Sequence, residues 1–173
     1  MKVTLLSYPT EQDWMGVKRR ALVTVGKQPI TPPDAEWMVK ILEARHSPIR
    51  YLHFSFLLED IPSWVSVHLV RHHVGVQPYV KSQRNDRQSD YDRTKAPQDA
   101  PVTMILDVNG EALLTLANKR LCKQASEETR EVVKMMCNEV TKVRKEFAPF
   151  LVPMCVYHGG RCHEMKPCQE GPR

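Results

Sequence analysis

The stretch YLHFSFLLEDIPSWVSVHLVRHH, residues 51–73, joins a strand pattern directly to a helix pattern. Aromatic and aliphatic side chains dominate residues 51–59, which predicts a strand. Residues 62–73 open with Pro and Ser and predict a short helix that ends at the basic triplet Arg71-His72-His73. A core segment would not carry so many hydrogen-bond donors, so the triplet predicts a site for an anion.

Upstream of this stretch the patterns alternate between strand and helix. Residues 2–8 predict a first strand, and residues 11–25 predict a helix that ends before a proline-rich break. Residues 34–45 predict an amphipathic helix whose apolar side chains fall on one face. Asp34 stands at the start of that helix, where its side chain can cap the first turn.

Downstream, residues 74–101 are rich in Gln, Asp, Arg and Pro and predict a long loop, which in a compact domain is usually functional or disordered. Residues 101–108 predict a strand. Residues 109–122 predict a helix capped by Asn109, and residues 126–147 predict a longer helix with an apolar stripe at helical spacing. These stripes indicate core packing and carry no functional message.

The size and composition of the chain indicate one α+β domain. Its 173 residues, 42% hydrophobic and 26% charged, are enough for one domain with a sizeable core. We expect this domain to span residues 1–150 and to be followed by a Cys/His-rich tail over residues 151–173.

The charge balance limits the kinds of binding partner that we expect. The net charge of +5 and a pI near 9.0 suit anionic ligands, and phosphorylated small molecules account for this excess as well as nucleic acid does. No apolar run approaches the roughly 20 residues of a membrane span. The first residues also lack the apolar stretch of a signal peptide. We therefore expect a cytoplasmic protein with reduced cysteines and no membrane partner.

The residue types around the triplet suit a phosphate or an electron-rich heterocycle. Arg gives permanently charged, two-pronged contacts and hydroxyl groups complete the shell, whereas His adds donors whose charge changes near neutral pH. The residues of these types are Arg71, Ser82, Arg84, Arg87, His68, His72 and His73.

Two alternatives stay open at this point. The first is a basic surface loop that binds nothing. The second is a metal site on His68 and His72, which are four residues apart on one helical face, although the HExxH arrangement and an obvious third ligand are both lacking.

Three separated places resemble the flavin-dependent thymidylate synthases (ThyX). The triplet and the later Ser82-Gln83-Arg84 resemble the family's Arg-His-Arg motif and Ser-x-Arg element. The spacing from the Phe-Ser-Phe segment to the triplet is also similar, and the resemblance covers roughly residues 45–148. The intervals of the family's later helix are reproduced by Asn109, Arg120, Ala125 and Glu128.

This resemblance implies an α+β fold with an antiparallel sheet packed by helices, and a homotetramer whose flavin site is built between subunits. It implies transfer of a one-carbon unit from methylenetetrahydrofolate to C5 of deoxyuridylate (dUMP). The hydride would come from reduced FAD, which NADPH reduces. No Cys nucleophile is needed, and none adjoins the basic motif.

The resemblance also implies residue roles. Flavin contacts are implied for Arg71, His72 and Asn109, with His73 and Ser55 as further candidates. Contacts to the nucleotide are implied for His68, which stands where the family usually has Gln, and for Ser82, Gln83 and Arg84.

Arg120 is implied as the catalytic group that faces the uracil ring and favours its ionised form. The physical reason is independent of the family. C5 of a uracil becomes nucleophilic only if negative charge on the ring is stabilised, and an adjacent guanidinium does this without changing its own protonation.

Departures from the family pattern fall in the nucleotide pocket. His73 replaces an Arg, Val80 an acidic residue and Asn85 an aromatic one, and one extra residue precedes Ser82. The Arg that the family uses on the phosphate has no counterpart, and Lys81 or Arg87 is the candidate substitute by charge.

Two alternative functions therefore stay open, namely action on a different pyrimidine nucleotide and a noncatalytic relative that binds nucleotides or nucleic acid. The basic loop has only Tyr79 and Tyr91 as aromatic residues, little of the stacking surface of single-strand binders, so nucleic acid is not the expected partner.

The tail raises a separate question. Its Cys and His residues suit tetrahedral zinc by ligand type, but their spacings match no common zinc finger, and Cys122 and Cys137 lie elsewhere in the sequence. We expect no metal here and keep zinc as the alternative. The residues concerned are Cys155, His158, Cys162, His163 and Cys168.

Overall fold

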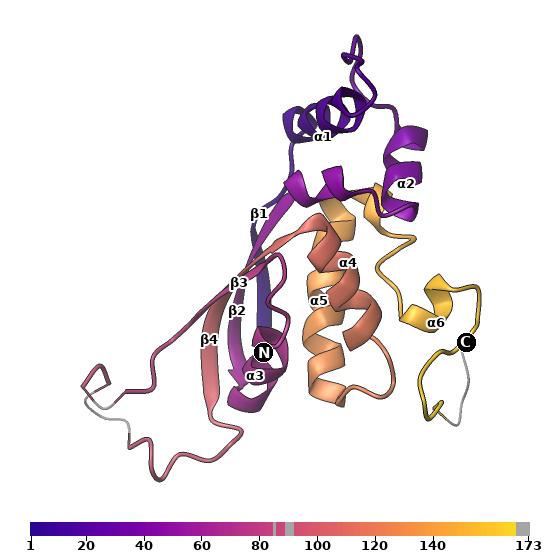
Figure 1. Cartoon of the computed structure of the whole chain (residues 1–173). Helices are drawn as coiled ribbons and strands as arrows, with labels where there is room; N and C mark the ends of the chain where they lie inside the picture. Colours follow the sequence, from indigo (N-terminus) through magenta and orange to yellow (C-terminus); the bar gives the residue numbers. More distant parts are fainter. Residues whose placement is uncertain (85, 89–91, 169–173) are drawn as a thin grey trace.

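A four-stranded antiparallel sheet in the order β1-β2-β4-β3 forms the centre of the protein (Figure 1). The computed structural model describes residues 1–84, 86–88 and 92–168. The strands are β1 (Lys2–Ser7), β2 (His53–Pro62), β3 (Val76–Val80) and β4 (Pro101–Asn109). The expected α+β class with an antiparallel sheet is thus confirmed, as are the strands expected at 2–8, 51–59 and 101–108.

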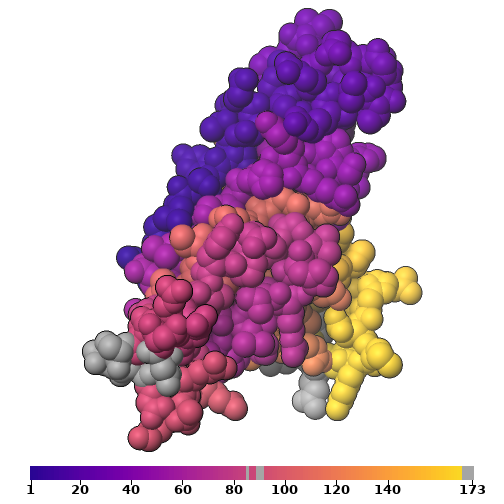
Figure 2. Space-filling view, turned by 60° about the vertical axis from the view of Figure 1, so that its left-hand side comes forward, coloured from indigo at the N-terminus to yellow at the C-terminus, as the bar shows by residue number. Residues whose placement is uncertain are grey.

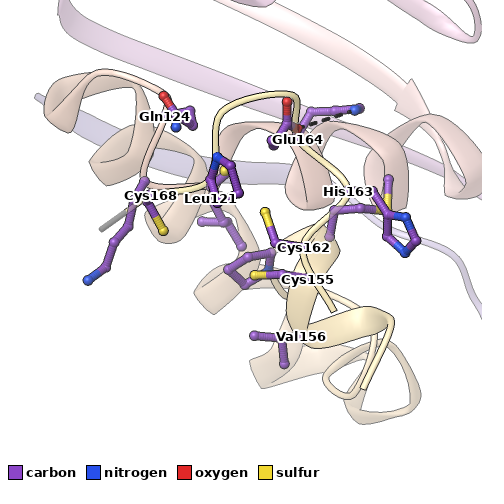
Figure 3. A pocket seen from close by; sticks show the side chains of 14 residues that line it. Leu121, Gln124, Cys155, Val156, Cys162, His163, Glu164 and Cys168 are labelled. Atoms are coloured by element: carbon purple, nitrogen blue, oxygen red, sulfur yellow. Dashed lines mark ion pairs between the residues drawn. The ribbon is translucent and has the colours of Figure 1, made fainter. Parts of the chain in front are cut away.

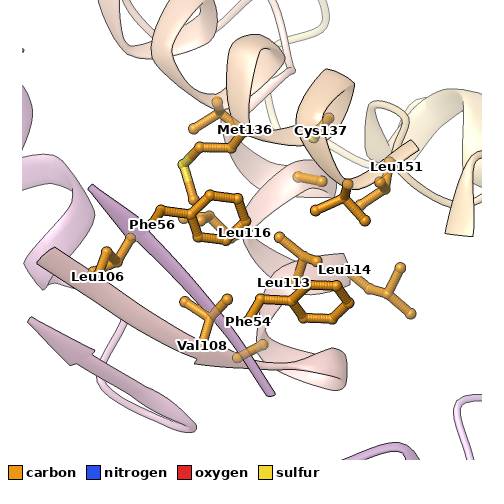
Figure 4. Close-up of a cluster of buried hydrophobic side chains, with 14 of the residues drawn as sticks. Phe54, Phe56, Leu106, Val108, Leu113, Leu114, Leu116, Met136, Cys137 and Leu151 are labelled. Carbon is orange, nitrogen blue, oxygen red and sulfur yellow. The ribbon is translucent and has the colours of Figure 1, made fainter. Parts of the chain in front are cut away.

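The core lies between one face of the sheet and the helices α4 (Gly110–Arg120) and α5 (Glu127–Val143). Successive strand residues point to opposite faces, so Phe54 and Phe56 of β2 both enter the core. They meet Leu113 of α4 and Met136 of α5, and Figure 4 shows these side chains facing one another. This packing places the C-terminal end of β4 and the start of α4 at one end of the core.

The N-terminal helices are α1 (Glu11–Val23) and α2 (Ala35–Glu43), followed by the 3-10 turn η1 (Ser47–Tyr51). The Asp34 side chain accepts a hydrogen bond from the backbone N–H of Trp37 at 2.8 Å, which confirms the expected cap. These elements lie at the end of the sheet away from the N-terminus (Figure 1).

Two expectations about secondary structure were wrong in part. The loop expected over residues 74–101 contains β3, which pairs with β4 at the edge of the sheet. Pro78 suggested a loop, but an edge strand tolerates a proline because one side of it needs no ladder hydrogen bond. The helix expected over 126–147 ends at Val143, since Arg144 has φ −135° and ψ 75°, and the 3-10 turn η2 (Lys145–Phe147) follows.

The tail is tied to the domain through a buried amide. The Asn118 side chain of α4 donates hydrogen bonds to the carbonyl oxygens of Phe150 (3.1 Å) and Val152 (2.6 Å). The short helix α6 (Met154–Tyr157) follows, and the Tyr157 hydroxyl donates to the Glu43 carbonyl at 2.8 Å. The division of the chain at residue 150 stays a prediction.

Two segments project from an elongated body in Figure 2, the described residues between β3 and β4 and the described residues that follow α6. Within the described part of the chain, no helix has the length and apolar character that crossing a bilayer requires.

Candidate functional site

A cavity of about 500 Å³ lies where the basic triplet meets the start of α4. The helix α3 (Ser63–Val70) ends immediately before the triplet, and the short turn to β3 brings it beside the end of β4. Four of the five residues expected to contact flavin line this cavity, namely Arg71, His72, His73 and Asn109.

Asn109 and Gly75 form one wall of the cavity. The Asn109 side-chain oxygen accepts from the backbone N–H of Ala112 at 2.9 Å, so this residue caps α4 as expected. Its backbone N–H donates to the Gly75 carbonyl at 2.9 Å. Gly75 has φ +73°, and a Cβ there would lie 2.3 Å from Asn109 Nδ2, so only glycine allows this close approach.

Arg120 lies at the C-terminal end of α4 and reaches back to the triplet. Its Nε donates to His72 Nε2 at 2.9 Å, and its Nη2 donates to the His68 carbonyl at 3.0 Å. The guanidinium is partly buried, and no carboxylate pairs with it among the residues that the structure describes. Burial and then the charge of Arg71 lower the pKa of Arg120, and a guanidinium still keeps its proton.

The two histidines that contact Arg120 are neutral at physiological pH. Burial, followed by the charges of Arg120 and His73, lowers the pKa of His72 to about 4. Burial, followed by the charges of Arg120 and Arg71, also lowers the pKa of His68. His72 therefore accepts at Nε2 and carries its proton on Nδ1.

The low pKa of His72 predicts a pH dependence of stability. Between pH 6.5 and about pH 4 the unfolded chain binds a proton at His72 that the folded chain does not, so stability falls as the pH falls through this window. We expect the loss of free energy of unfolding between about pH 7 and about pH 5, measured by urea titration, to be smaller in His72→Gln.

The exposed His46 supplies the matched control. His46→Gln is expected to lose as much stability over the same pH range as the unmutated chain. Equal losses in the His46 and His72 variants would contradict the assignment to His72.

Arg50 and Glu111 also line the cavity, and sequence reasoning missed both. The Arg50 guanidinium pairs with the Glu111 carboxylate, and this pair raises the pKa of Arg50. Glu111 follows Asn109 by two residues, so its position in the first turn of α4 could have placed it near the cavity. Arg50 had no comparable signal.

The single chain does not bring the other expected residues to this cavity. Ser55 lies on the sheet face opposite Phe54 and Phe56, next to Asp107 of β4. Ser82 and Gln83 line a separate hollow of about 60 Å³. The Arg84 guanidinium binds Asp86 through two hydrogen bonds of 2.9 and 2.7 Å. Their roles toward flavin or nucleotide stay predictions.

The structure bears on the metal alternatives but not on two residues of the basic loop. Asn85 and Tyr91 lie outside the described residues. Within residues 1–84, 86–88 and 92–168, no three His, Cys, Asp or Glu side chains gather in a way that could hold a metal ion.

The tail cysteines nevertheless lie around one pocket of about 290 Å³. Figure 3 shows Cys155, Cys162 and Cys168 around this pocket, with Leu121 between them. Cys122 also lines it, although the sequence separates Cys122 from the tail. The end of α4 packs beside α6, which brings Cys122 to the tail.

Comparisons with known proteins rest on the fold. No protein-family model and no curated protein matches the sequence. Among solved structures, thymidylate synthase X (ThyX) from Helicobacter pylori with FAD and dUMP is similar, with a TM-score of 0.68 and 14% identity over 87% of this chain and 97% of that chain. A UMP/dUMP methylase, PolB from Streptomyces cacaoi bound with 5-Br dUMP, has a TM-score of 0.67 and 14% identity over 87% and 96% of the two chains.

A second Helicobacter pylori ThyX structure, complexed with FAD and dUMP, has a TM-score of 0.67 and 12% identity over 87% of this chain and 98% of that one. At sequence identities this low, the structural similarity shows a shared fold and nothing more. The chain therefore has the fold of ThyX, as its resemblance to that family implied.

Proposed function

We propose that this protein is an enzyme of the ThyX type that transfers a one-carbon unit to C5 of dUMP, with FAD as its cofactor. The observation that carries the proposal is Arg120, a partly buried guanidinium without a carboxylate partner in the described part of the chain, beside a cavity lined by Arg71. A buried cation without a counter-ion costs free energy unless an anion meets it.

Arg120 is suited to stabilise a pyrimidine ring as the ring becomes negatively charged. Two protein acceptors, His72 Nε2 and the His68 carbonyl, fix the guanidinium plane. A fixed donor stabilises developing negative charge without reorganising during the reaction. Because His72 stays neutral, the hydrogen bond from Arg120 persists across the physiological pH range.

The cavity residues fit FAD. Arg50, Arg71 and His73 offer donors to an anionic phosphate group, and the Gly75 backbone lets a ligand approach closely. When bound, FAD would supply the hydride that reduces the transferred carbon. Arg71, His72 and Asn109 would hold it, while the Arg120–His72 hydrogen bond would link the cofactor cavity to the nucleotide.

One chain alone leaves several of the expected residues away from the cavity, so further components would complete the site. We propose that a homotetramer brings Ser55, Ser82, Gln83 and Arg84 of other subunits to it, since one chain keeps them apart from the cavity. Methylenetetrahydrofolate and NADPH are the proposed co-substrates, and the cytoplasm is the proposed compartment.

The likeness to PolB supports a second candidate, the same chemistry on UMP.

Two measurements test this function directly. The purified protein should retain FAD, seen in its visible absorbance, and calorimetry should show dUMP binding that strengthens in the presence of FAD. A protein that binds neither FAD nor a pyrimidine nucleotide would contradict the proposal.

Asn109 allows a sharper test because its side chain has two separable roles, the cap of α4 and the proposed contact to FAD. Asn109→Ala is expected to weaken FAD affinity about tenfold and to cost about 1 kcal/mol of stability, because it removes both the amide and the cap of α4. Asn109→Ser keeps a capping oxygen but removes the amide donor. FAD affinity should therefore fall in both variants, whereas stability should fall only in the Ala variant.

The measurements are FAD titration by fluorescence and urea unfolding. Arg71→Ala and His72→Ala are expected to weaken FAD binding as well. Unchanged FAD affinity in the Arg71, His72 and Asn109 variants would overturn the placement of the cofactor.

A further inference from the structure

Glu111 is the single acidic residue among the described residues that line the cavity of about 500 Å³. Two guanidinium groups, those of Arg50 and Arg71, line the same cavity. The carboxylate cancels one of these two permanent positive charges. A site that served only to attract phosphate groups would bind them more tightly without this carboxylate, so Glu111 is expected to have a role of its own toward the ligand.

A close approach of η1 to the start of α4 brings Glu111 to Arg50. The Gly110 backbone N–H donates to the Leu52 carbonyl at 2.8 Å. A Cβ at Gly110 would lie 2.7 Å from the Ile49 carbonyl oxygen, so a larger residue would push the two elements apart. Arg50 follows Ile49 and Glu111 follows Gly110, and the Arg50 Nε donates to Glu111 Oε2. The backbone contact therefore fixes the position of this ion pair in the cavity wall.

The ion pair leaves polar atoms of both partners available to a ligand. The Arg50 side chain is 60% exposed and that of Glu111 is 30% exposed. A pair with this much exposure contributes little to stability, so folding alone does not account for it. In the part of the chain that the structure describes, the Arg50 Nη groups and Glu111 Oε1 have no hydrogen-bond partner. The pair thus offers donors and a charged acceptor side by side.

We infer that Glu111 is a specificity-determining residue that accepts hydrogen bonds from hydroxyl groups of the cofactor and repels free phosphate. The inference rests on the proposed function. FAD carries hydroxyl groups on the same chain as its phosphates, so it donates to Glu111 while its phosphates meet Arg50 and Arg71. Inorganic phosphate instead brings its charge close to the carboxylate. In dinucleotide-binding folds an acidic side chain likewise binds a ribose hydroxyl, and an Arg is used where a phosphate takes the place of that hydroxyl.

The test compares FAD with inorganic phosphate in Glu111→Gln, which removes the charge and keeps the size of the side chain. Calorimetry at constant ionic strength measures the phosphate affinity, and fluorescence titration measures the FAD affinity. We expect the phosphate affinity to rise about tenfold. The FAD affinity should not rise, because the loss of charge-assisted hydrogen bonds to hydroxyl groups offsets the relief of repulsion. The preference for FAD over phosphate should therefore fall about tenfold or more.

Two further variants separate a local effect from a change of net charge. Glu36→Gln makes the same charge change on α2, where Glu36 is 77% exposed and pairs with Lys40, and should leave both affinities unchanged. The double variant Arg50→Gln/Glu111→Gln should lose the gain in phosphate affinity, because it also removes the cation that the single substitution frees.

Three outcomes would contradict the inference. An equal gain for FAD and phosphate in Glu111→Gln would show that Glu111 only screens charge, and the proposed function would stand. A gain in phosphate affinity that persists in the double variant would exclude the role of the Arg50–Glu111 pair. Failure of the unmutated protein to bind FAD would overturn both the inference and the proposed function.

Discussion

Replacing Arg120 by Lys is expected to lower turnover by about two orders of magnitude or more, with only a modest loss of nucleotide affinity. Lys keeps the positive charge, so attraction for the nucleotide persists. It loses the planar fork that donates at once to His72 and to the His68 carbonyl, and that we propose also donates to the nucleotide. The stabilisation lost is specific to the ionised ring and therefore appears in turnover.

The measurement is flavin reoxidation in the presence of dUMP and methylenetetrahydrofolate, beside nucleotide affinity by calorimetry. Arg19→Lys is the matched control, because Arg19 is exposed on α1. It should leave both quantities unchanged. Normal turnover of the Arg120→Lys protein would make Arg120 a structural residue.

Replacing Arg144 by Ala is expected to lower the free energy of unfolding by about 3–5 kcal/mol. Arg144 is buried where α5 ends, and its Nε donates to the Pro9 carbonyl. Its Nη1 lies 2.6 Å from the Glu11 carboxylate and 3.9 Å from that of Glu146. The substitution leaves the Pro9 carbonyl without this donor and the partly buried Glu146 without its cation.

The Glu11 contact should account for little of this loss, because the Glu11 side chain is 73% exposed. Glu11→Gln is therefore the control and should cost less than about 1 kcal/mol. Urea unfolding at neutral pH measures both variants. A similar small effect of the two substitutions would show that Arg144 does not join α5 to the N-terminal segment.

The elements that could be predicted are those that neighbouring residues determine. Asp34 and Asn109 cap helices through backbone N–H groups three residues away, so the local sequence was sufficient. The alternation in β2, with Phe54 and Phe56 buried and Ser55 between them on the other face, also depends only on neighbours. The flavin candidates on the triplet were found because they are contiguous in the sequence.

The elements that could not be predicted depend on partners far away in the chain. β3 carries Pro78 and polar residues, and it is a strand only because β4 supplies the other half of its ladder. The clustering of Cys122 with the tail cysteines likewise requires α4 and α6 to pack together.

Local sequence patterns were enough to predict the order of most elements, their caps and the residue types of the anion site, since these follow from backbone hydrogen bonds and side-chain periodicity within a few residues. Which of those residues meet depends on how distant elements pack. Arg120 contacts His72 across 48 positions and Thr129 contacts His68 across 61, because α5 packs beside both α3 and α4. Whether a histidine is neutral, and which of its nitrogens carries the proton, depends on these distant partners and on burial.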